Sequence, residues 1–396
     1  AGATYLIFGK ATPFSPTFDL ADLVNNINGN NAVRLDGIAL DDRSGFAVAG
    51  LGDVNGDGFD DFIIGGYNAD PNGLDSGAAY VVFGKADWSA TPIFSLALLD
   101  GTNGFRLNGH APGDWAGYSV SAAGDVNGDG YADILIGAYR GEPGAGISPY
   151  DTKEGLAYVV FGKATGFAAD LNLHDLDGTD GFRIEGVNVA DQTARSVSAA
   201  GDFNGDGFAD IIIGVHEGDA DFDADPTTNE GKAYVVFGKA DWSATPVLSL
   251  ADIDGTNGVK FNGVNPIDFA GWSVSSAGDV NGDGFDDIII GASRADSGGF
   301  APNNNFIDSG RAYIVFGGAS WAVTGSAGFD LSTIDGTNGF VVNGFRTFDY
   351  AGFSVTGVGD VNGDGFDDIL IGAPGANSHV NGVNTNSPPS GVPLNS

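Results

Sequence analysis

The sequence contains no cysteine and no methionine, and only five of its 52 acidic residues are glutamate. Without cysteine there is no disulfide framework. Because methionine is missing even at position 1, we expect the chain to be a processed or excised segment. The excess of aspartate over glutamate favours turns and short oxygen-rich metal loops over solvated helical faces.

Basic residues are also scarce, with 16 Lys and Arg against 52 acidic residues and a formal net charge of −36. This charge argues against nucleic acid and anionic membranes as partners, and it suits divalent cations or cationic partners. No apolar run approaches the roughly 20 residues of a membrane span, so we expect no membrane insertion. No signal peptide remains at Ala1.

Glycine is abundant, with 66 residues, and hydrophobic residues make up 42% of the chain, which is enough for a core. Short β-rich runs alternate with Gly, Asn and Asp, and no 3.6-residue periodicity is sustained. This pattern predicts an all-β fold.

One central unit recurs five times: a first strand, a G-D-V-N-G-D-G-F-D-D loop or a close variant, and an apolar second strand. In the first four repeats two more strand patterns follow, the first of them close to A-Y-V-V-F-G. Four short strands at a fixed period are typical of a propeller blade. The period is 72 to 81 residues, counted between the leading aspartates Asp53, Asp125, Asp202, Asp279 and Asp360.

The two ends of the chain complement each other. The fifth unit lacks its last two strands, and matching patterns occur at residues 3–10 and 32–37. We therefore predict a β-propeller of five four-stranded blades, in which the N-terminal strands complete the last blade and close the ring, removing exposed edges. The alternative is that these strands complete a neighbouring molecule's blade and build a polymer. Residues 1–376 would form the propeller and 377–396 a Gly/Asn/Pro-rich tail or linker.

Each loop follows D-x-N-G-D-G-x-x-D, a pattern that converges oxygen atoms as Ca²⁺ requires. Positions one, three, five and nine supply side-chain oxygens, position seven supplies its backbone carbonyl, and glycine at position six permits the turn. The Glu at position twelve of an EF-hand is replaced by Ile, so we expect the ninth-position Asp to take the terminal ligand role. Mg²⁺ fits less well, because it retains its waters.

We predict about five calcium ions, one per blade. The alternative is a set of metal-free Asx-rich turns, but clustered carboxylates would then repel, so calcium should contribute to folding stability. The predicted ligands are Asp53, Asn55, Asp57, Phe59, Asp61, Asp125, Asn127, Asp129, Tyr131, Asp133, Asp202, Asn204, Asp206, Phe208, Asp210, Asp279, Asn281, Asp283, Phe285, Asp287, Asp360, Asn362, Asp364, Phe366 and Asp368.

The Gly-aromatic-Ser-Val strand, the acidic loop and the following I-G-A resemble the FG-GAP repeats of integrin α-subunit propellers and their bacterial relatives. The resemblance extends to about residue 376. It implies calcium in the loop between strands one and two, ligand-binding loops on the opposite face, and an extracellular or surface protein. Integrin propellers have seven blades, however, and the third repeat has Ala194-Arg195 in place of Gly-aromatic.

On the face opposite the acidic loops, five aspartates precede the first strands. They are either turn residues or a carboxylate ring for a cation or a basic group: Asp42, Asp114, Asp191, Asp268 and Asp349. The loops between strands two and three vary in length and content, which suits recognition as well as neutral drift. These loops span residues 67–76, 139–154, 216–230 and 293–309.

Two further features each have two interpretations. The alternating acidic loop Asp219–Asp225 is either a sixth metal site or a solvated loop. The tryptophans in the long connections, Trp88, Trp242 and Trp321, are either packing anchors or a platform for sugars.

The sequence therefore predicts a non-enzymatic, extracellular or cell-surface, calcium-binding adhesion or recognition module. Its ligand would be a protein or a glycan on the loop face opposite the calcium loops. One alternative is a filament or surface-layer subunit assembled by strand exchange. A carboxylate-based hydrolase built on the aspartate ring is disfavoured, because glutamate is scarce and no catalytic motif is present.

Overall fold

The computed structural model describes residues 1–12, 20, 29, 31–143, 153–218, 229–298, 305–319, 321, 328–376, 379–380 and 383–384 of the chain. Apart from short 3₁₀ turns, the regular structure in these ranges is β, which confirms the all-β prediction. The predicted acidic loop Asp219–Asp225 and most of the predicted tail at 377–396 lie outside the described residues. Within the described residues, no helix combines the length and apolarity that crossing a membrane requires.

Four antiparallel units of four strands follow one another along the chain, and we call them blades 1 to 4. Blade 1 consists of β3 (Ala47–Gly52), β4 (Asp61–Gly66), β5 (Ala78–Val82) and β7 (Gly104–Asn108). Blade 2 consists of β8 (Ser119–Gly124), β9 (Asp133–Ala138), β10 (Leu156–Val160) and β12 (Gly181–Glu185). Blade 3 consists of β13 (Val197–Gly201), β14 (Asp210–Val215), β15 (Lys232–Val236) and β17 (Gly258–Asn262). Blade 4 consists of β18 (Ala270–Gly278), β19 (Asp287–Ala292), β22 (Arg311–Val315) and β24 (Gly339–Asn343).

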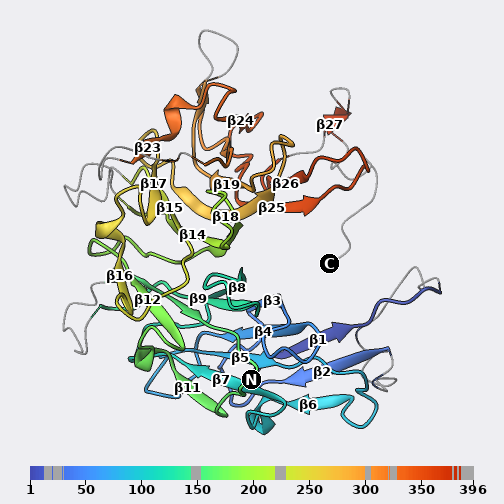
Figure 1. Ribbon diagram of the computed structural model, residues 1–396. Coiled ribbons are helices and arrows are strands. Elements are labelled where there is room, and N and C mark those ends of the chain that lie inside the picture. Colours follow the sequence, from blue (N-terminus) through green and yellow to red (C-terminus); the bar gives the residue numbers. More distant parts are fainter. Residues whose placement is uncertain are drawn as a thin grey trace.

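The two ends of the chain form separate, smaller sheets. The N-terminal half-blade pairs β1 (Ala3–Ile7) with β2 (Ala32–Asp36), and the C-terminal half-blade pairs β25 (Ser354–Gly359) with β26 (Asp368–Gly372). In the described residues no ladder joins the two, so closure of a five-bladed ring stays a prediction. Figure 1 shows the two half-blades, blue and red, on either side of the open part of the ring.

A fifth, parallel strand, which the sequence analysis did not foresee, links neighbouring sheets. It comes from the long connection of the following repeat and pairs with the outermost strand of the preceding sheet. These strands are β6 (Ile93–Ser95) on β2, β11 (Asp170–Asn172) on β7, β16 (Val247–Ser249) on β12, and β23 (Phe329–Asp330) on β17. Each leads into a 3₁₀ turn that starts with a buried leucine: η1 (Leu96–Leu98), η2 (Leu173–Asp175), η3 (Leu250–Asp252) and η4 (Leu331–Thr333). Adjacent sheets are therefore connected by backbone hydrogen bonds as well as by packing.

The core lies between the sheets. The second strands β9, β14 and β19 are buried along their whole length, because each has a neighbouring sheet on both faces. One cluster, for example, joins Leu135 and Val159 of blade 2 to Ile211 and Val236 of blade 3. Two short hairpins, β20 (Ser297–Gly298) with β21 (Asn305–Phe306) and β27 (His379–Val380) with β28 (Val383–Asn384), lie outside this core.

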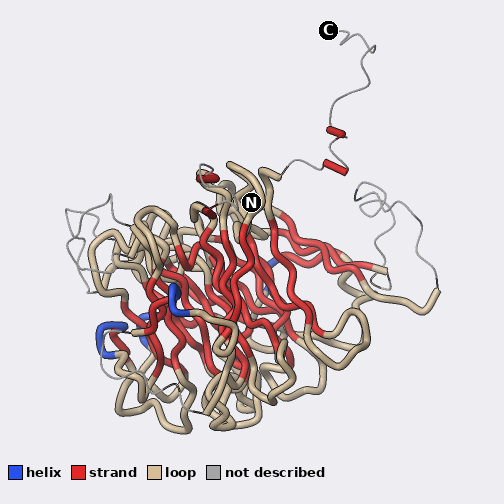
Figure 2. The backbone as a smooth tube through the Cα atoms, turned by 90° about the horizontal axis from the view of Figure 1, so that it is seen from above, coloured by secondary structure: helices blue, strands red, loops and turns tan. Residues whose placement is uncertain are grey.

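The first strands β3, β8, β13, β18 and β25 contact one another in sequence around the centre of Figure 1. Their small residues allow this close approach: the Ser119 hydroxyl donates to the Ala194 carbonyl at 2.9 Å, and the Val274 N–H donates to the Ser196 hydroxyl at 3.0 Å. Loops gather at the two ends of the strands (Figure 2). The acidic loops between strands one and two lie at one end, and the approaches to the first strands lie at the other.

Candidate metal centre

The loop between β3 and β4 folds around the carboxylate of its leading aspartate. Asp53 accepts the N–H groups of Gly56 at 2.7 Å, Asp57 at 3.1 Å and Gly58 at 2.9 Å. The Asn55 amide donates to the Asp57 carboxylate at 3.0 Å and accepts the Asp57 N–H at 2.9 Å. Gly56 and Gly58 have φ of 73° and 88°, which glycine adopts readily. Positions one, three and five are thus brought together as predicted.

The same hydrogen bonds recur in the other loops. The leading aspartate accepts the N–H groups of positions five and six in every repeat, and the fifth-position carboxylate accepts the N–H of position seven. One local fold therefore serves five loops, and it organises the carboxylates without help from distant residues.

The ninth-position aspartates of blades 1 to 4 are buried beneath the loops. In blade 1, Asp61 accepts the Val54 N–H at 2.9 Å and the Gly84 N–H at 2.7 Å, so it ties the loop to the end of strand three. Burial is the largest cause that raises the pKa of these carboxyls, and the carboxylates at positions five and one raise it further. The pKa rises to about 6 for Asp61, about 7 for Asp133, about 8 for Asp210 and about 7 for Asp287.

This donor set fits a divalent cation. A buried carboxyl whose charged form is disfavoured, with two more carboxylates close by, gains stability when a cation neutralises the group. No three His, Cys, Asp or Glu side chains in the described ranges form a ready-made metal cluster. Each loop instead combines carboxylates with an Asn amide and a backbone carbonyl, the oxygen set that calcium takes. Each carboxylate oxygen of Asp61 accepts one backbone N–H. An ion would therefore bind through the second lone pair of one of these oxygens.

The loop of the C-terminal half-blade has the same local fold but different surroundings. Asp368 accepts the Val361 N–H at 2.9 Å and is only partly buried. In blades 1 to 4 a glycine just after strand three supplies the second N–H, whereas the C-terminal half-blade has only two strands in the described residues. Val361 is 72% exposed, whereas Val54 and Val126 are fully buried.

Neighbouring loops are also chained together. From blade 2 onward, the seventh-position aromatic of a loop lies against the fourth-position glycine of the preceding loop: a Cβ placed on Gly56 would lie 2.5 Å from the Tyr131 ring. The Ala132 N–H also donates to the Asp53 carbonyl at 3.2 Å. Further aromatic–glycine contacts of this kind are Phe208 on Gly128, Phe285 on Gly205 and Phe366 on Gly282. The recurrence of glycine and an aromatic at these positions in all five repeats was the signal for this contact in the sequence.

At the opposite end, the five aspartates before the first strands are turn residues. Each is buried and accepts the N–H of the residue three positions earlier, at distances of 2.7 to 3.3 Å. The turn interpretation of Asp42, Asp114, Asp191, Asp268 and Asp349 is therefore confirmed. Burial raises the pKa of Asp114 to about 7 and that of Asp268 to about 6.

The tryptophans of the long connections are packing residues. Trp88 and Trp242 are 5% and 3% exposed, and Trp242 stacks on Phe182 with ring centroids 3.6 Å apart. Trp321 stacks on Phe203 at 5.1 Å. The buried rings of Trp88 and Trp242 do not offer a platform for sugars, and the partly buried Trp321 packs against blade 3.

Comparison with known proteins agrees with the repeat pattern. The FG-GAP repeat family matches residues 116–160, 193–236, 270–315 and 351–387. Integrin alpha-4 of Xenopus laevis is 30% identical over 194 residues, which cover 49% of this chain and 16% of that protein. Integrin alpha pat-2 of Caenorhabditis elegans is 30% identical over 267 residues, 66% of this chain and 18% of that protein. Phosphatidylinositol-glycan-specific phospholipase D of Bos taurus is 27% identical over 261 residues, 65% of this chain and 26% of that protein. The chain thus spans a quarter or less of the length of most of these relatives.

Proposed function

The chain belongs to the integrin α-like FG-GAP repeat proteins, and on this premise we propose that it is a calcium-binding β-propeller that acts outside the cell or on its surface in adhesion or recognition. Its ligand is a protein or a glycan, bound at the end opposite the calcium loops. The observation that carries the proposal is the contrast between the two ends of the blades. One end repeats a single acidic loop, and the other carries the loops that differ from blade to blade.

Calcium would be held in each loop by the side chains of positions one, three, five and nine and by the carbonyl of position seven. The ion supplies the positive charge that the clustered carboxylates lack. Support comes from the buried ninth-position carboxyls and from the loop hydrogen bonds that already gather the other donors. The residues of the chain organise the loop, and the ion adds stability rather than shape.

Calcium loading is tested on the intact chain by native mass spectrometry and calorimetric titration. We expect about five bound ions, one for each acidic loop, and no comparable response to magnesium. A chain that binds no calcium at millimolar concentrations, or whose fold is indifferent to chelation, would contradict the proposal.

We also propose that residues 1–376 form a single five-bladed domain, in which the two half-blades unite. Aligning β26–β1 with the observed pairing of β4–β5 places Leu370 opposite Leu6 and Ile371 opposite Tyr5. Leu370 is 61% exposed, whereas Ile63 at the same position of blade 1 is fully buried. The unpaired hairpin thus exposes residues that belong in a core.

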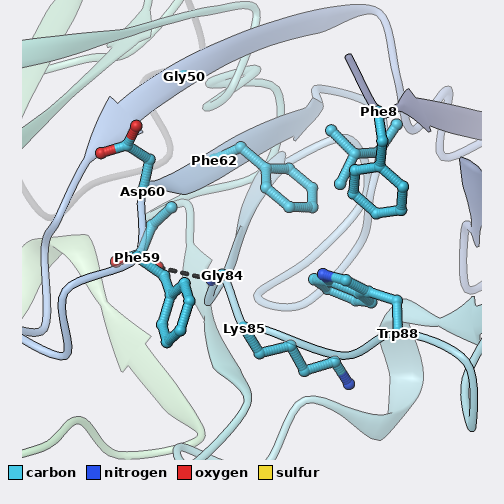
Figure 3. Close-up of a pocket in the computed structure, with 10 residues that line it drawn as sticks. Phe8, Gly50, Phe59, Asp60, Phe62, Gly84, Lys85 and Trp88 are labelled. Carbon is cyan, nitrogen blue, oxygen red and sulfur yellow. Dashed lines mark hydrogen bonds between the residues drawn. The ribbon is translucent and has the colours of Figure 1, made fainter. Parts of the chain in front are cut away.

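A pocket of about 330 Å³ lies where this union would take place (Figure 3). Leu6 and Phe8 of the N-terminal half-blade line it together with residues of blade 1 that include Phe59 and Trp88. Two contacts found at the other junctions have no counterpart here. The Lys163 N–H donates to the Val54 carbonyl at 2.9 Å, and the matching acceptor for Lys85 would be Val361.

The second missing contact concerns the aromatic chain around the loops. No atom of the described residues lies within 4 Å of a Cβ placed on Gly363, whereas the same position of each other loop is covered by an aromatic ring. Phe59, the seventh-position aromatic of blade 1, is 42% exposed. Among the described residues, Gly363 is therefore the one fourth-position glycine that no aromatic ring covers, and Phe59 is the one seventh-position aromatic that covers no such glycine. Closure of the ring would bring the two residues together.

Closure is tested with the double variant Leu6→Cys and Leu370→Cys, since the chain has no other cysteine. At low protein concentration we expect an internal disulfide and a monomer. The control pair Leu6→Cys and Ile289→Cys carries its second cysteine at the same position of the complete blade 4, and it should stay reduced. Disulfide-linked dimers and longer ladders would show that the half-blades pair between molecules.

Pairing between molecules defines the second candidate function, a subunit of an extracellular filament or surface layer. The exposed half-blades favour it, because each presents an unpaired strand edge to a partner. Native mass over a range of concentrations separates the two candidates: a monomer throughout excludes assembly by strand exchange. We infer no enzymatic activity, because the phospholipase D relative shares only a quarter of its length with this chain.

A further inference from the structure

Aromatic side chains surround the centre of the molecule at the end opposite the calcium loops. They include the second residue of the Gly-aromatic-Ser-Val motif and the residue that follows strand two. We call six of them the aromatic arc: Phe46, Trp115, Tyr118, Tyr139, Trp272 and Phe353. Ring centroids are 4.9 Å apart for Phe46 and Tyr118, 4.5 Å for Tyr118 and Tyr139, and 5.6 Å for Trp272 and Phe353. The arc thus extends across several blades.

Arginine side chains lie on these rings. Arg195 is 3.8 Å from the centroid of Trp272, and Arg140 is 4.4 Å from that of Trp115. Arg195 occupies the one motif position that is not aromatic. Burial raises the pKa of the Tyr139 hydroxyl, and the charges of Arg140 and Arg195 lower it. The contact of Arg195 with Trp272 links blade 3 to the part of the arc on blade 4.

Two more arginines extend the set. Arg43 lies 5.5 Å from the centroid of Tyr67, to whose hydroxyl it also donates, and Arg294 lies 5.2 Å from that of Phe269. Blades 1 to 4 each contribute one arginine, although the chain has a net charge of −36. An arginine against an aromatic ring thus recurs in each of these four blades, which an isolated ion pair would not do.

Acidic side chains offset part of this charge. Glu217 lies near Arg195, and Asp308 lies near Arg294. A guanidinium stacked on a ring keeps its N–H donors in its own plane, where they are able to pair with a second anion. Stacking also fixes the long side chain, so less entropy is lost when a ligand binds.

We propose that the aromatic arc and its arginines bind an acidic polysaccharide that carries carboxylates on successive or alternate sugars. This inference rests on the proposed recognition function and names its ligand class. One guanidinium per blade matches a polymer with regularly spaced charges better than a single acidic side chain. The exposed rings of Phe46 and Phe353 offer apolar faces to the sugar rings. Because the rest of the chain is strongly acidic, it repels the polymer elsewhere and orients it on this end.

The test titrates the full chain in saturating calcium with glucuronate-containing oligosaccharides of defined length, followed by calorimetry and tryptophan fluorescence. The matched neutral probe is the same oligosaccharide with its carboxyls methyl-esterified. We expect the acid to bind, with an affinity that falls as salt rises, and the ester not to bind. The variant Arg195→Ala should lose about tenfold in affinity or more, and Arg195→Lys should recover only part of it because the guanidinium fork is missing.

The control variant is Arg106→Ala, which removes an arginine from the outer edge, where it pairs with Asp170 at 2.7 Å. It should bind the acid as the unchanged chain does. Equal binding of acid and ester, or an equal response of the Arg195 and Arg106 variants, would overturn the inference. Tighter binding of a poly-glutamate peptide of equal charge would overturn it in favour of a protein segment.

Failure of this inference is distinguishable from failure of the proposed function. A ligand found on a protein or glycan array that binds only with calcium and ignores Arg195→Ala would refute the arc while the recognition function stands. A chain that finds no ligand and whose stability is unaffected by chelation would refute both. Thermal unfolding and the calcium count of each variant exclude misfolding as the cause of lost binding.

Discussion

Blade 2 and the C-terminal half-blade share one loop motif and differ in what surrounds it. Val126 and Leu135 of blade 2 are fully buried, whereas Val361 and Leu370 at the same positions are 72% and 61% exposed. Both loops nevertheless share three local hydrogen bonds: the N–H groups of positions five and six donate to the leading aspartate, and that of position seven donates to the fifth-position carboxylate. The loop fold is thus a property of the nine-residue motif, whereas burial of its base is a property of a completed blade.

This difference has an electrostatic consequence. In blade 2 the N–H of Gly162, just after strand three, donates to Asp133, and burial raises the pKa of this carboxyl to about 7. A completed blade therefore encloses an acid whose charge is disfavoured, next to two further carboxylates. Calcium should offset the free-energy cost of burying the charged carboxylate most strongly where the blade is complete. Ion binding and ring closure should therefore favour each other.

The largest expected effect is that of calcium removal, which acts on every loop at once. At a free calcium concentration of about ten times Kd, each site contributes roughly 1.4 kcal/mol, and five sites roughly 7 kcal/mol. We expect excess EGTA to lower the unfolding temperature by about 8 °C, because the unfolding entropy of a chain of 396 residues is about 0.8 kcal/mol/K. Thermal melts with calcium, with EGTA and with magnesium measure the effect, and coincident melts in calcium and EGTA would contradict it.

Truncating the same core position in the two regions sharpens the comparison further. Leu135→Ala should cost about 2–5 kcal/mol, because it opens a cavity between the sheets of blades 2 and 3. Leu370→Ala should cost a similar amount if the ring closes, and little if the half-blade stays exposed. Urea unfolding of both variants in saturating calcium distinguishes these outcomes, and a near-zero cost for Leu370→Ala alone would count against closure.

Much of this architecture could be predicted from the sequence, because the strands and the loop of each repeat are determined by residues close together in the chain. The loop motif fixes its own turns through Asp53 and Gly56, and continuous apolar runs such as that of β9 identify sheets covered on both faces. The parallel fifth strands escaped prediction because they are two or three residues long and lie within irregular connections, where no periodicity marks them. Their pairing depends on the neighbouring blade, as at Asp170 beside Arg106.

The arginine-bearing end was missed for a related reason. In the sequence, the aromatic residue at the motif position of Tyr118 was only part of the resemblance to the repeat family, and Arg195 was a departure from it. Only the arrangement in space places Arg195 on Trp272, a residue 77 positions further along the chain. Contacts between repeats depend on how neighbouring sheets are placed around the centre of the molecule. The sequence of a single repeat does not predict this placement.

A smaller expected effect is the pH dependence of the stability that a buried turn aspartate, Asp114, contributes. Burial raises the pKa of Asp114 to about 7, above its ordinary value of 3.8, so the folded chain holds a proton there that the unfolded chain releases. The contribution of Asp114 to stability is therefore full below about pH 4 and is lost as pH rises through about 7. Stability of the unchanged chain relative to Asp114→Asn should fall across this window.

This pH dependence is measured by urea unfolding of both proteins from pH 4.5 to 8.5 in saturating calcium. The difference between the two proteins isolates Asp114, because the loop aspartates titrate alike in both. Asn retains the acceptor for the Ala111 N–H, which lies 2.9 Å from the carboxylate. A difference that stays constant with pH would mean that Asp114 is ionised throughout.

The smallest effect compares two glycines of the loops, Gly128 of blade 2 and Gly363 of the half-blade. Both have positive φ, 72° and 77°, so alanine costs about 1–2 kcal/mol at either position from backbone strain alone. At Gly128 the new Cβ would also meet the Phe208 ring, whereas no atom in the described part of the chain lies within 4 Å of a Cβ at Gly363. If the ring closes in solution, Phe59 covers Gly363 and the two substitutions should destabilise the chain equally. If Gly363→Ala costs less than Gly128→Ala by the amount of the ring contact, the half-blade is open, and the double variant Gly363→Ala with Phe59→Ala should then show no coupling.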